Sequence, residues 1–290
     1  MPRVIVARPS GFCFGVERAI RLARAGKERF GRVATLGELV HNPLVLEELA
    51  TAGIRAVSRP SEAKGEAVVI RAHGCPPQVI RHCRRLGLKL IDATCPYVRK
   101  VQDVARRLRR QGYTVVVVGE RNHPEVKGIL AHCAGAGRVY SPRMRLATRR
   151  IGVVAQTTMA RDRFRAAVAS LARLRYTELR VFDTICKEVV ARQEAAARVA
   201  AAAGLVIVVG GRNSANTARL AEIARAAGRE VMLAERAELL DRTRLRGCRK
   251  VAVVAGSSTP SWVVREITEI VRNPGRADRK KHGRLKEDRD

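Results

Sequence analysis

Short apolar runs alternate with longer segments of helical periodicity along most of the chain. The runs are three to six residues long and rich in valine and isoleucine, which is typical of buried strands in a parallel sheet. Most of the segments between them repeat apolar residues every three or four positions, as amphipathic helices do. The predicted strands are 4–7, 33–37, 54–57, 67–72, 88–93, 114–119, 139–141, 151–155, 179–184, 205–210, 231–234 and 251–255. We therefore predict an α/β fold with mostly parallel sheets.

A threefold repeat runs through this pattern. Three times a predicted strand ends at a cysteine where a helix begins, and two later strands of each repeat end in polar residues. The cysteines are Cys13, Cys95 and Cys186, the second-strand ends are His41, His123 and Ser214, each 28 residues after its cysteine, and the third-strand ends are His73, Thr157 and Ser258. Such a repeat predicts three similar modules, each offering one thiolate and two polar groups to a shared centre.

The three predicted modules span residues 1–94, 95–183 and 184–272, while the pattern groups the strands in fours that begin with 4–7, 88–93 and 179–184. One alternative stays open, because the first strand of a module can also pair in the sheet of a neighbouring module. Ligands of parallel α/β sheets collect beyond the carboxyl ends of the strands, and the nine repeated positions all lie there. Residues 273–290 are polar and basic without apolar periodicity, so we expect a disordered tail.

The chain is strongly basic. Lys and Arg number 57 against 27 Asp and Glu, a net charge of +30, which raises the question of nucleic-acid binding. In the predicted helix 98–111, however, the arginines lie off the apolar stripe, as on the solvent face of an ordinary amphipathic helix. Aromatic residues make up only 3% of the chain, so few side chains can stack on the bases of single-stranded nucleic acid. We expect a basic surface on a soluble enzyme, and we do not expect nucleic acid as a partner.

No apolar run reaches membrane-spanning length and the N-terminus lacks a signal-peptide core, so we expect a cytoplasmic protein without a membrane partner.

Seven widely spaced cysteines, an odd number, do not resemble a secreted disulfide framework. Three repeated thiolates suffice for an iron–sulfur cluster with one iron left without a protein ligand, or for an open zinc site. The spacing does not choose between them. The cysteines without repeat partners are expected to be structural: Cys75, Cys83, Cys133 and Cys248.

Polar groups at the other strand ends suit a small anion and proton transfer. The segments 210–217 and 255–260 place glycines and hydroxyls before helices, which suits a phosphate, although such residues also favour ordinary N-cap positions. His41 and His73 add donors that can become charged near neutral pH. Together these groups predict a pocket for a compact dianion or trianion. Glu125 and Thr157 are candidates for proton transfer, since a glutamate beside a redox-active metal can act as a general acid.

Eight short motifs occur in order over nearly the whole chain. They are Gly11-Phe12-Cys13-Phe14-Gly15-Val16, His41-Asn42, Ala72-His73-Gly74, Asp92-Ala93-Thr94-Cys95-Pro96, His123-Pro124-Glu125, Gln156-Thr157-Thr158, Asn213-Ser214-Ala215-Asn216 and Ala255-Gly256-Ser257-Ser258. Together they resemble the 4-hydroxy-3-methylbut-2-enyl diphosphate reductase family, also called the LytB family.

The resemblance implies a pseudo-threefold trefoil of α/β modules around a central 4Fe–4S cluster held by Cys13, Cys95 and Cys186. One iron of that cluster would lack a protein ligand. The residues implied to bind the substrate are His41, His73, His123, Thr157, Ser214, Asn216 and Ser258, and those implied to act in catalysis are Glu125, Thr157 and His123, with Glu125 feeding the proton.

The implied reaction is the last step of the non-mevalonate isoprenoid pathway. Two electrons and two protons would remove the allylic hydroxyl as water and leave isopentenyl and dimethylallyl diphosphate. From the charge we add that the basic surface should dock an acidic one-electron donor such as ferredoxin or flavodoxin.

The chain departs from the family pattern in three places, at four residues. Glu188 and Val189 stand where the family usually has Ala-Thr after the third cysteine, so a hydroxyl near the cluster is lost. Ala215 replaces the second serine of Asn-Ser-Ser-Asn, which predicts weaker diphosphate binding because a hydrogen bond to a charged group contributes about 1.5–3 kcal/mol. Cys75 replaces a commoner apolar residue near His73.

Two other classes of function stay open. A basic nucleic-acid-binding protein on an inactivated reductase scaffold would be colourless and would bind RNA with a steep salt dependence. A zinc hydrolase using the same cysteines would hold stoichiometric zinc and show no redox activity.

Overall fold

The computed structural model describes residues 2–63 and 65–274. Its strands form three four-stranded sheets with every neighbouring pair parallel. Sheet A has the order β1 (Arg3–Val6), β12 (Lys250–Ala255), β10 (Leu205–Val209) and β11 (Glu230–Ala234). Sheet B has the order β3 (Ile54–Val57), β2 (Val33–Leu36), β4 (Ala67–Ile70) and β5 (Lys89–Asp92). Sheet C has the order β7 (Gly137–Val139), β6 (Thr114–Val118), β8 (Arg150–Ala155) and β9 (Glu178–Phe182). The predicted α/β class with three parallel-sheet modules is confirmed.

Helices connect the strands throughout. The α-helices are α1 (Phe14–Phe30), α2 (Pro43–Thr51), α3 (Pro77–Arg85), α4 (Pro96–Arg110), α5 (Pro124–Ala131), α6 (Arg161–Leu171), α7 (Lys187–Ala201), α8 (Ala215–Ala226) and α9 (Ser261–Arg272). Short 3-10 helices cover Pro60–Ala63, Ala237–Leu239 and Arg242–Leu245. Among the described residues, no helix is both long and apolar enough to cross a membrane. Of the predicted tail, residues 275–290 lie outside the part that the structure describes.

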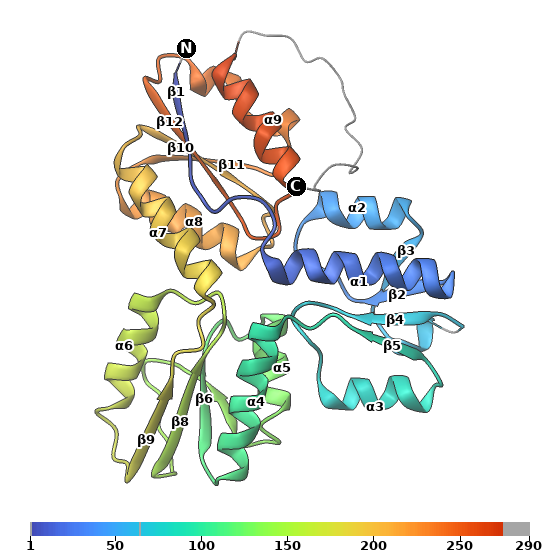
Figure 1. Cartoon of the computed structure of the whole chain (residues 1–290). Coiled ribbons are helices and arrows are strands. Elements are labelled where there is room, and N and C mark those ends of the chain that lie inside the picture. The colour runs from blue at the N-terminus through green and yellow to red at the C-terminus, as the bar shows by residue number, and fades with distance from the viewer. Residues whose placement is uncertain (1, 64, 275–290) are drawn as a thin grey trace. The chain divides into compact units, whose positions relative to one another are not determined.

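The chain divides into two compact units, which we describe separately. One contains residues 13–191 with sheets B and C, and the other contains the segments before residue 13 and after residue 191, with sheet A. Figure 1 shows the shared design of the sheets, in which parallel strands lie between layers of helix. The trefoil arrangement implied by the sequence stays a prediction.

Sheet pairing corrects the assignment of the strands that lead into the cysteines. The sequence pattern grouped 88–93 with the second module and 179–184 with the third, but β5 pairs with β4 and β9 pairs with β8. Likewise β1 completes sheet A by pairing with β12, so the predicted first module 1–94 does not hold its own first strand. The strand that leads into each cysteine is therefore an edge strand of a sheet. This is the neighbouring-module alternative that the sequence left open.

Sheet C shows how the apolar runs position the strand ends. Val115 and Val117 of β6 pack with α4 and α5, while Val116 and Val118 pack with Phe164 and the rest of the cluster under α6. All four valines are at most 4% exposed. A fully buried valine contributes roughly 1.5–3 kcal/mol, so the sheet is held firmly on both faces. The loops after its strands, which carry the candidate site, thus rise from a rigid platform.

Candidate active site

Each repeated cysteine occupies the residue just before a helix. The carbonyl of Cys13 accepts from the N–H of Glu17, and the carbonyls of Cys95 and Cys186 accept from the N–H groups of the residues four positions later. The segments that lead into Cys95 and Cys186 are built alike. The Asp92 carboxylate accepts from the Thr94 N–H at 2.9 Å, and the Asp183 carboxylate accepts from the Ile185 N–H at 3.1 Å. Such turns direct the chain out of the edge strand and into the helix.

The three cysteines lie close together within the unit 13–191. A Cβ added to Gly15 would lie 2.6 Å from the Cys95 sulfur and 3.9 Å from the Cys13 sulfur, so both sulfurs flank the same glycine. Burial raises the pKa of Cys95, and the charges of Cys13 and Cys186 raise it further. Burial also raises the pKa of Cys186, with a further contribution from Cys13. Each pair among Cys13, Cys95 and Cys186 is therefore close enough for one thiolate to affect the other. The structure thus brings together the three cysteines that the repeat singled out.

This donor set fits an iron–sulfur cluster. Three thiolates that repel one another need a cation, although nearby backbone N–H groups at the helix starts lower the pKa of Cys95 and Cys186 in part. Among the described residues, the group of ligand atoms that lie within 4.8 Å of one another is a separate one, formed by His41, His73 and His123. Three thiols suit an iron–sulfur cluster with one iron free of protein ligands, or an open zinc site.

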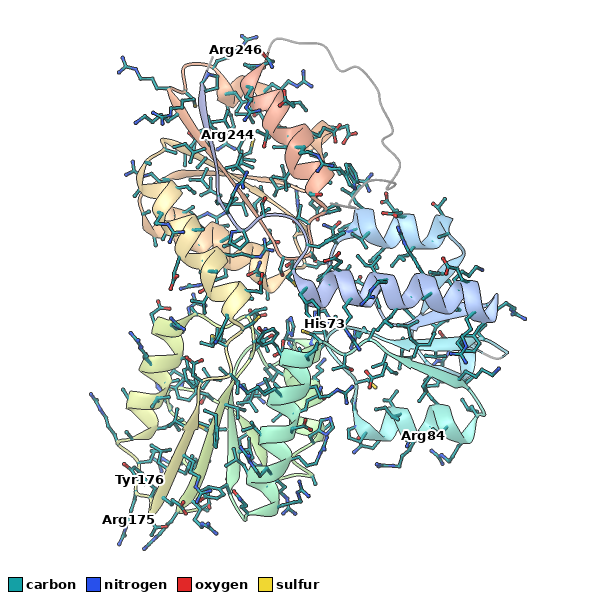
Figure 2. All side chains as sticks on the ribbon, viewed as in Figure 1. His73, Arg84, Arg175, Tyr176, Arg244 and Arg246 are labelled. Atoms are coloured by element: carbon teal, nitrogen blue, oxygen red, sulfur yellow. The ribbon has the colours of Figure 1, made fainter. Side chains whose placement is uncertain are left out.

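Three histidines from sheets B and C form the second group of the site. The rings of His41 and His73 stack with centroids 4.5 Å apart, and the His123 ring meets them edge-on at 5.8 and 5.4 Å. Figure 2 shows His73 in this unit. Burial lowers the pKa of His73 well below its usual value and lowers that of His123 to about 4. At neutral pH, with no ligand bound, these two rings are thus neutral. The sequence analysis expected a His73 that can become charged near neutral pH, and burial opposes that charge.

Hydrogen bonds fix the proton positions on two of these rings. The Nδ1 of His123 accepts from the backbone N–H of Glu125 at 3.1 Å, so the neutral ring carries its proton on Nε2. The Nδ1 of His41 lies 3.0 Å from a carboxylate oxygen of Glu38, which makes it the donor in that pair. The protonated Nε2 of His123 makes that ring a hydrogen-bond donor toward a ligand, not a metal ligand.

A further cation, which the sequence analysis missed, reinforces that conclusion. Arg71 lowers the pKa of both His73 and His123 through its charge, and its Nε is buried without a hydrogen-bond partner among the described residues. A guanidinium beside the rings disfavours a bound metal cation and favours an anion. In the sequence, Arg71 is a single arginine between strand 67–70 and His73. In a chain this basic, nothing distinguishes it from an ordinary surface charge.

Glu125 is the most perturbed acid of the site. It is 1% exposed, and burial raises its pKa to about 7, although two hydrogen bonds from Thr157 lower it in part. The backbone N–H of Thr157 donates to Oε1 and its hydroxyl donates to Oε2, both at 2.7 Å. Glu125 therefore exchanges its proton near neutral pH while in direct contact with a hydroxyl side chain. This is what a general acid requires.

The remaining predicted residues lie in the other unit, at the carboxyl ends of β10 and β12. Ser214 caps α8 by accepting from the Thr217 N–H at 3.3 Å, and Ser258 is 5% exposed in the loop before α9. Asn216 is 2% exposed, and both polar atoms of its amide lack a hydrogen-bond partner among the described residues. A buried amide in this condition points to a ligand, because leaving it unpaired costs free energy.

The family departures have local consequences. Val189 is buried, and the backbone N–H groups of Glu188 and Val189 still lower the pKa of Cys186, since any residue type supplies an N–H. Ala215 is the first residue of α8, beside the Ser214 cap. Burial raises the pKa of Cys75 to about 12 and that of Cys133 to about 11. These two thiols are inert at neutral pH, in agreement with a structural role.

A family model described as LytB protein matches residues 4–272. The chain belongs to the LytB family. Among its LytB relatives, a protein of Aquifex aeolicus named 4-hydroxy-3-methylbut-2-enyl diphosphate reductase is 40% identical, over 92% of this chain and 95% of the relative. A protein of the same name from Geobacter sulfurreducens is 38% identical, over 97% of this chain and 99% of the relative.

Two solved LytB structures also match. One, described as the terminal enzyme of the non-mevalonate pathway, is 39% identical with a TM-score of 0.69, covering 94% of this chain and 99% of that one. The Plasmodium falciparum reductase is 25% identical with a TM-score of 0.90, covering 94% of this chain and 89% of that one. The fold and the family are thereby shown by independent comparisons.

Proposed function

We propose that this protein is a 4-hydroxy-3-methylbut-2-enyl diphosphate reductase. The reaction would take up two electrons and two protons, release the allylic hydroxyl as water and form isopentenyl and dimethylallyl diphosphate. The observation that carries the proposal is the link between the thiol trio and a carboxylic acid with a pKa of about 7: the Cys186 N–H donates to the Thr157 carbonyl at 2.9 Å, and Thr157 in turn donates to Glu125. The names of the relatives support the same activity.

Cys13, Cys95 and Cys186 would hold a 4Fe–4S cluster in this proposal. A cluster with one iron free of protein ligands supplies single electrons and Lewis acidity at the substrate hydroxyl. The protein contributes helix-start N–H groups that partly stabilise the thiolates of Cys95 and Cys186. It also contributes Gly15, where any side chain would meet the Cys95 sulfur.

Glu125 would deliver the proton through Thr157. Because the backbone N–H of Thr157 occupies Oε1, a proton on Glu125 resides on Oε2, which faces the Thr157 hydroxyl at 2.7 Å. That hydroxyl can then accept from Glu125 and donate to the leaving oxygen. Hydroxide is a poor leaving group, so protonation is what allows the oxygen to depart as water.

The diphosphate would be bound by neutral donors and one fixed charge. His123 presents its Nε2–H, His41 and His73 stack beside it, and Arg71 adds a permanent positive charge close by. Ser214, Asn216 and Ser258 would supply further donors, which stays a prediction from the family motifs. An arriving anion favours the charged forms of the histidines, so binding should be coupled to proton uptake.

The test is anaerobic purification followed by iron and sulfide analysis and turnover. The expected result is a brown protein that converts the hydroxylated diphosphate to the two products with dithionite and methyl viologen. A colourless preparation that neither takes up iron on reconstitution nor turns over would overturn the proposal. Stoichiometric zinc in the same preparation would favour the hydrolase reading instead.

A further inference from the structure

The proposed reaction needs two electrons from outside the chain, so the protein must present a surface where a donor can approach the thiols. This inference rests on the proposed function. Cys13 and Cys95 are partly exposed, whereas Cys186 is buried at 9% exposure. The side of the trio formed by Cys13 and Cys95 is therefore the side open to a donor.

Two exposed aromatic side chains stand beside these two cysteines. Phe14 directly follows Cys13 and is 54% exposed, and Tyr97 follows Cys95 by two residues and is 36% exposed. Neither aromatic side chain packs in the hydrophobic core. The first buried apolar side chains there are Val16 in α1 and Val98 in α4. Large aromatic side chains on a surface are typical of contact sites for other proteins.

The starts of α1 and α4 belong to one continuous surface. Gly15 lies against the Cys95 sulfur, and the guanidinium of Arg18 donates to the backbone carbonyl of Thr94 at 3.3 Å. The first turn of α1 thus packs against the segment that leads into α4. Phe14 and Tyr97 are the exposed aromatic side chains in the first turns of these two helices.

Unpaired cations lie further along α1 and α4 and at the start of α7. Arg21 lies two helical turns beyond Phe14, Lys100 lies one turn beyond Tyr97, and Lys187 directly follows Cys186; all three are exposed. No ion pair of these three side chains occurs within the part of the chain that the structure describes. By contrast, Arg99 pairs with Asp92. Unpaired cations near the exposed side chains of Phe14 and Tyr97 suit contact with an acidic protein.

We propose that Phe14, Arg21, Tyr97, Lys100 and Lys187, here named the entry surface, dock an acidic one-electron carrier protein. Its acidic rim would meet the three cations while its exposed redox group approaches the aromatic side chains. Each docking event oxidises one carrier by one electron. Two events with two protons complete one turnover: the allylic C–O bond breaks, a C–H bond forms and water leaves.

The test compares two electron sources in the same holoenzyme. Reduced methyl viologen is small and needs no docking surface, whereas reduced ferredoxin serves as the acidic carrier probe. The variants are Tyr97→Ala and the charge reversal Arg21→Glu with Lys100→Glu. At low salt we expect the charge reversal to lower kcat/KM for ferredoxin about tenfold or more and to flatten its salt dependence. The rate with methyl viologen should stay within about twofold, since no direct contact to substrate changes.

Arg175 and Tyr176 provide a matched control. Both are exposed, Tyr176 at 39%, and Figure 2 shows them at the far end of sheet C, next to the start of β9. Arg175→Glu with Tyr176→Ala should leave both rates unchanged. The location is refuted if the control loses as much ferredoxin activity as the entry-surface variants, or if those variants lose none. Equal losses with both donors also overturn it, because they indicate damage to the site. Failure of the unsubstituted enzyme with methyl viologen would instead count against the proposed function.

Discussion

Thr157 directs both of its donors at one carboxylate: its backbone N–H reaches Oε1 of Glu125 and its hydroxyl reaches Oε2, each at 2.7 Å. The two hydrogen bonds differ in what they permit. The backbone N–H can only donate, whereas the hydroxyl can reverse its role when Glu125 becomes protonated. The pair therefore selects the oxygen that holds the transferable proton.

Replacing Thr157 by valine tests this relay. Thr157→Val keeps the backbone N–H but removes the hydroxyl, and since that hydrogen bond lowers the pKa of Glu125, its loss raises the pKa further. We expect kcat to fall roughly 10²- to 10⁴-fold, with the alkaline limb of the pH–kcat profile moved to higher pH. Thr148→Val is the control and should match the unsubstituted enzyme, because Thr148 is partly exposed and its hydroxyl bonds the backbone of Arg150. A normal kcat in Thr157→Val would exclude the relay.

Glu125 should also make stability depend on pH. Its pKa is about 7 in the folded protein and 4.5 as its ordinary value, so between these values the folded state holds a proton that the unfolded state has released. Stability therefore falls as pH rises from about 4.5 to 7 and stays low above that. Glu125→Gln lacks this contribution. Urea midpoints measured at pH 5 and pH 8 should differ less in the variant, and an unchanged difference contradicts the raised pKa.

The cysteine trio predicts selective loss of iron. Serine at position 13, 95 or 186 replaces a thiolate with a poor iron ligand, so each single variant should lose most of its iron and sulfide and all detectable turnover. Cys248→Ser is the matched control, because Cys248 is also partly exposed and its sulfur donates only to the Arg244 carbonyl. Full iron content in Cys95→Ser would show that the trio is not the ligand set.

Restoring the family serine should strengthen anion binding. Ala215→Ser adds one hydroxyl at the first residue of α8, beside Ser214 and the unpartnered amide of Asn216. A hydrogen bond to a charged group contributes about 1.5 kcal/mol at the lower end, so the Kd for inorganic diphosphate should fall about tenfold. Ala218→Ser, exposed one turn later on the same helix, should leave it unchanged. Calorimetry with both variants decides the matter.

Much of the candidate site was predictable because local patterns encode it. The cysteines stand where an apolar run ends and a helix begins, and the 28-residue spacing marks the equivalent His41, His123 and Ser214. Strand ends in parallel sheets gather at one edge, so these positions indicated a site before any coordinates. The family motifs then supplied the roles of Glu125 and Asn216.

Tertiary structure decided what depends on distant neighbours. An edge strand such as β1 is as apolar as any other, so only its pairing with β12 shows which sheet it completes. The ordinary pKa values of His73 and Glu125 are properties of the residue types, but burial by segments remote in sequence makes the first neutral and the second a proton donor near pH 7. Sequence determined which groups are present, and packing determined their charge because desolvation depends on everything that surrounds them.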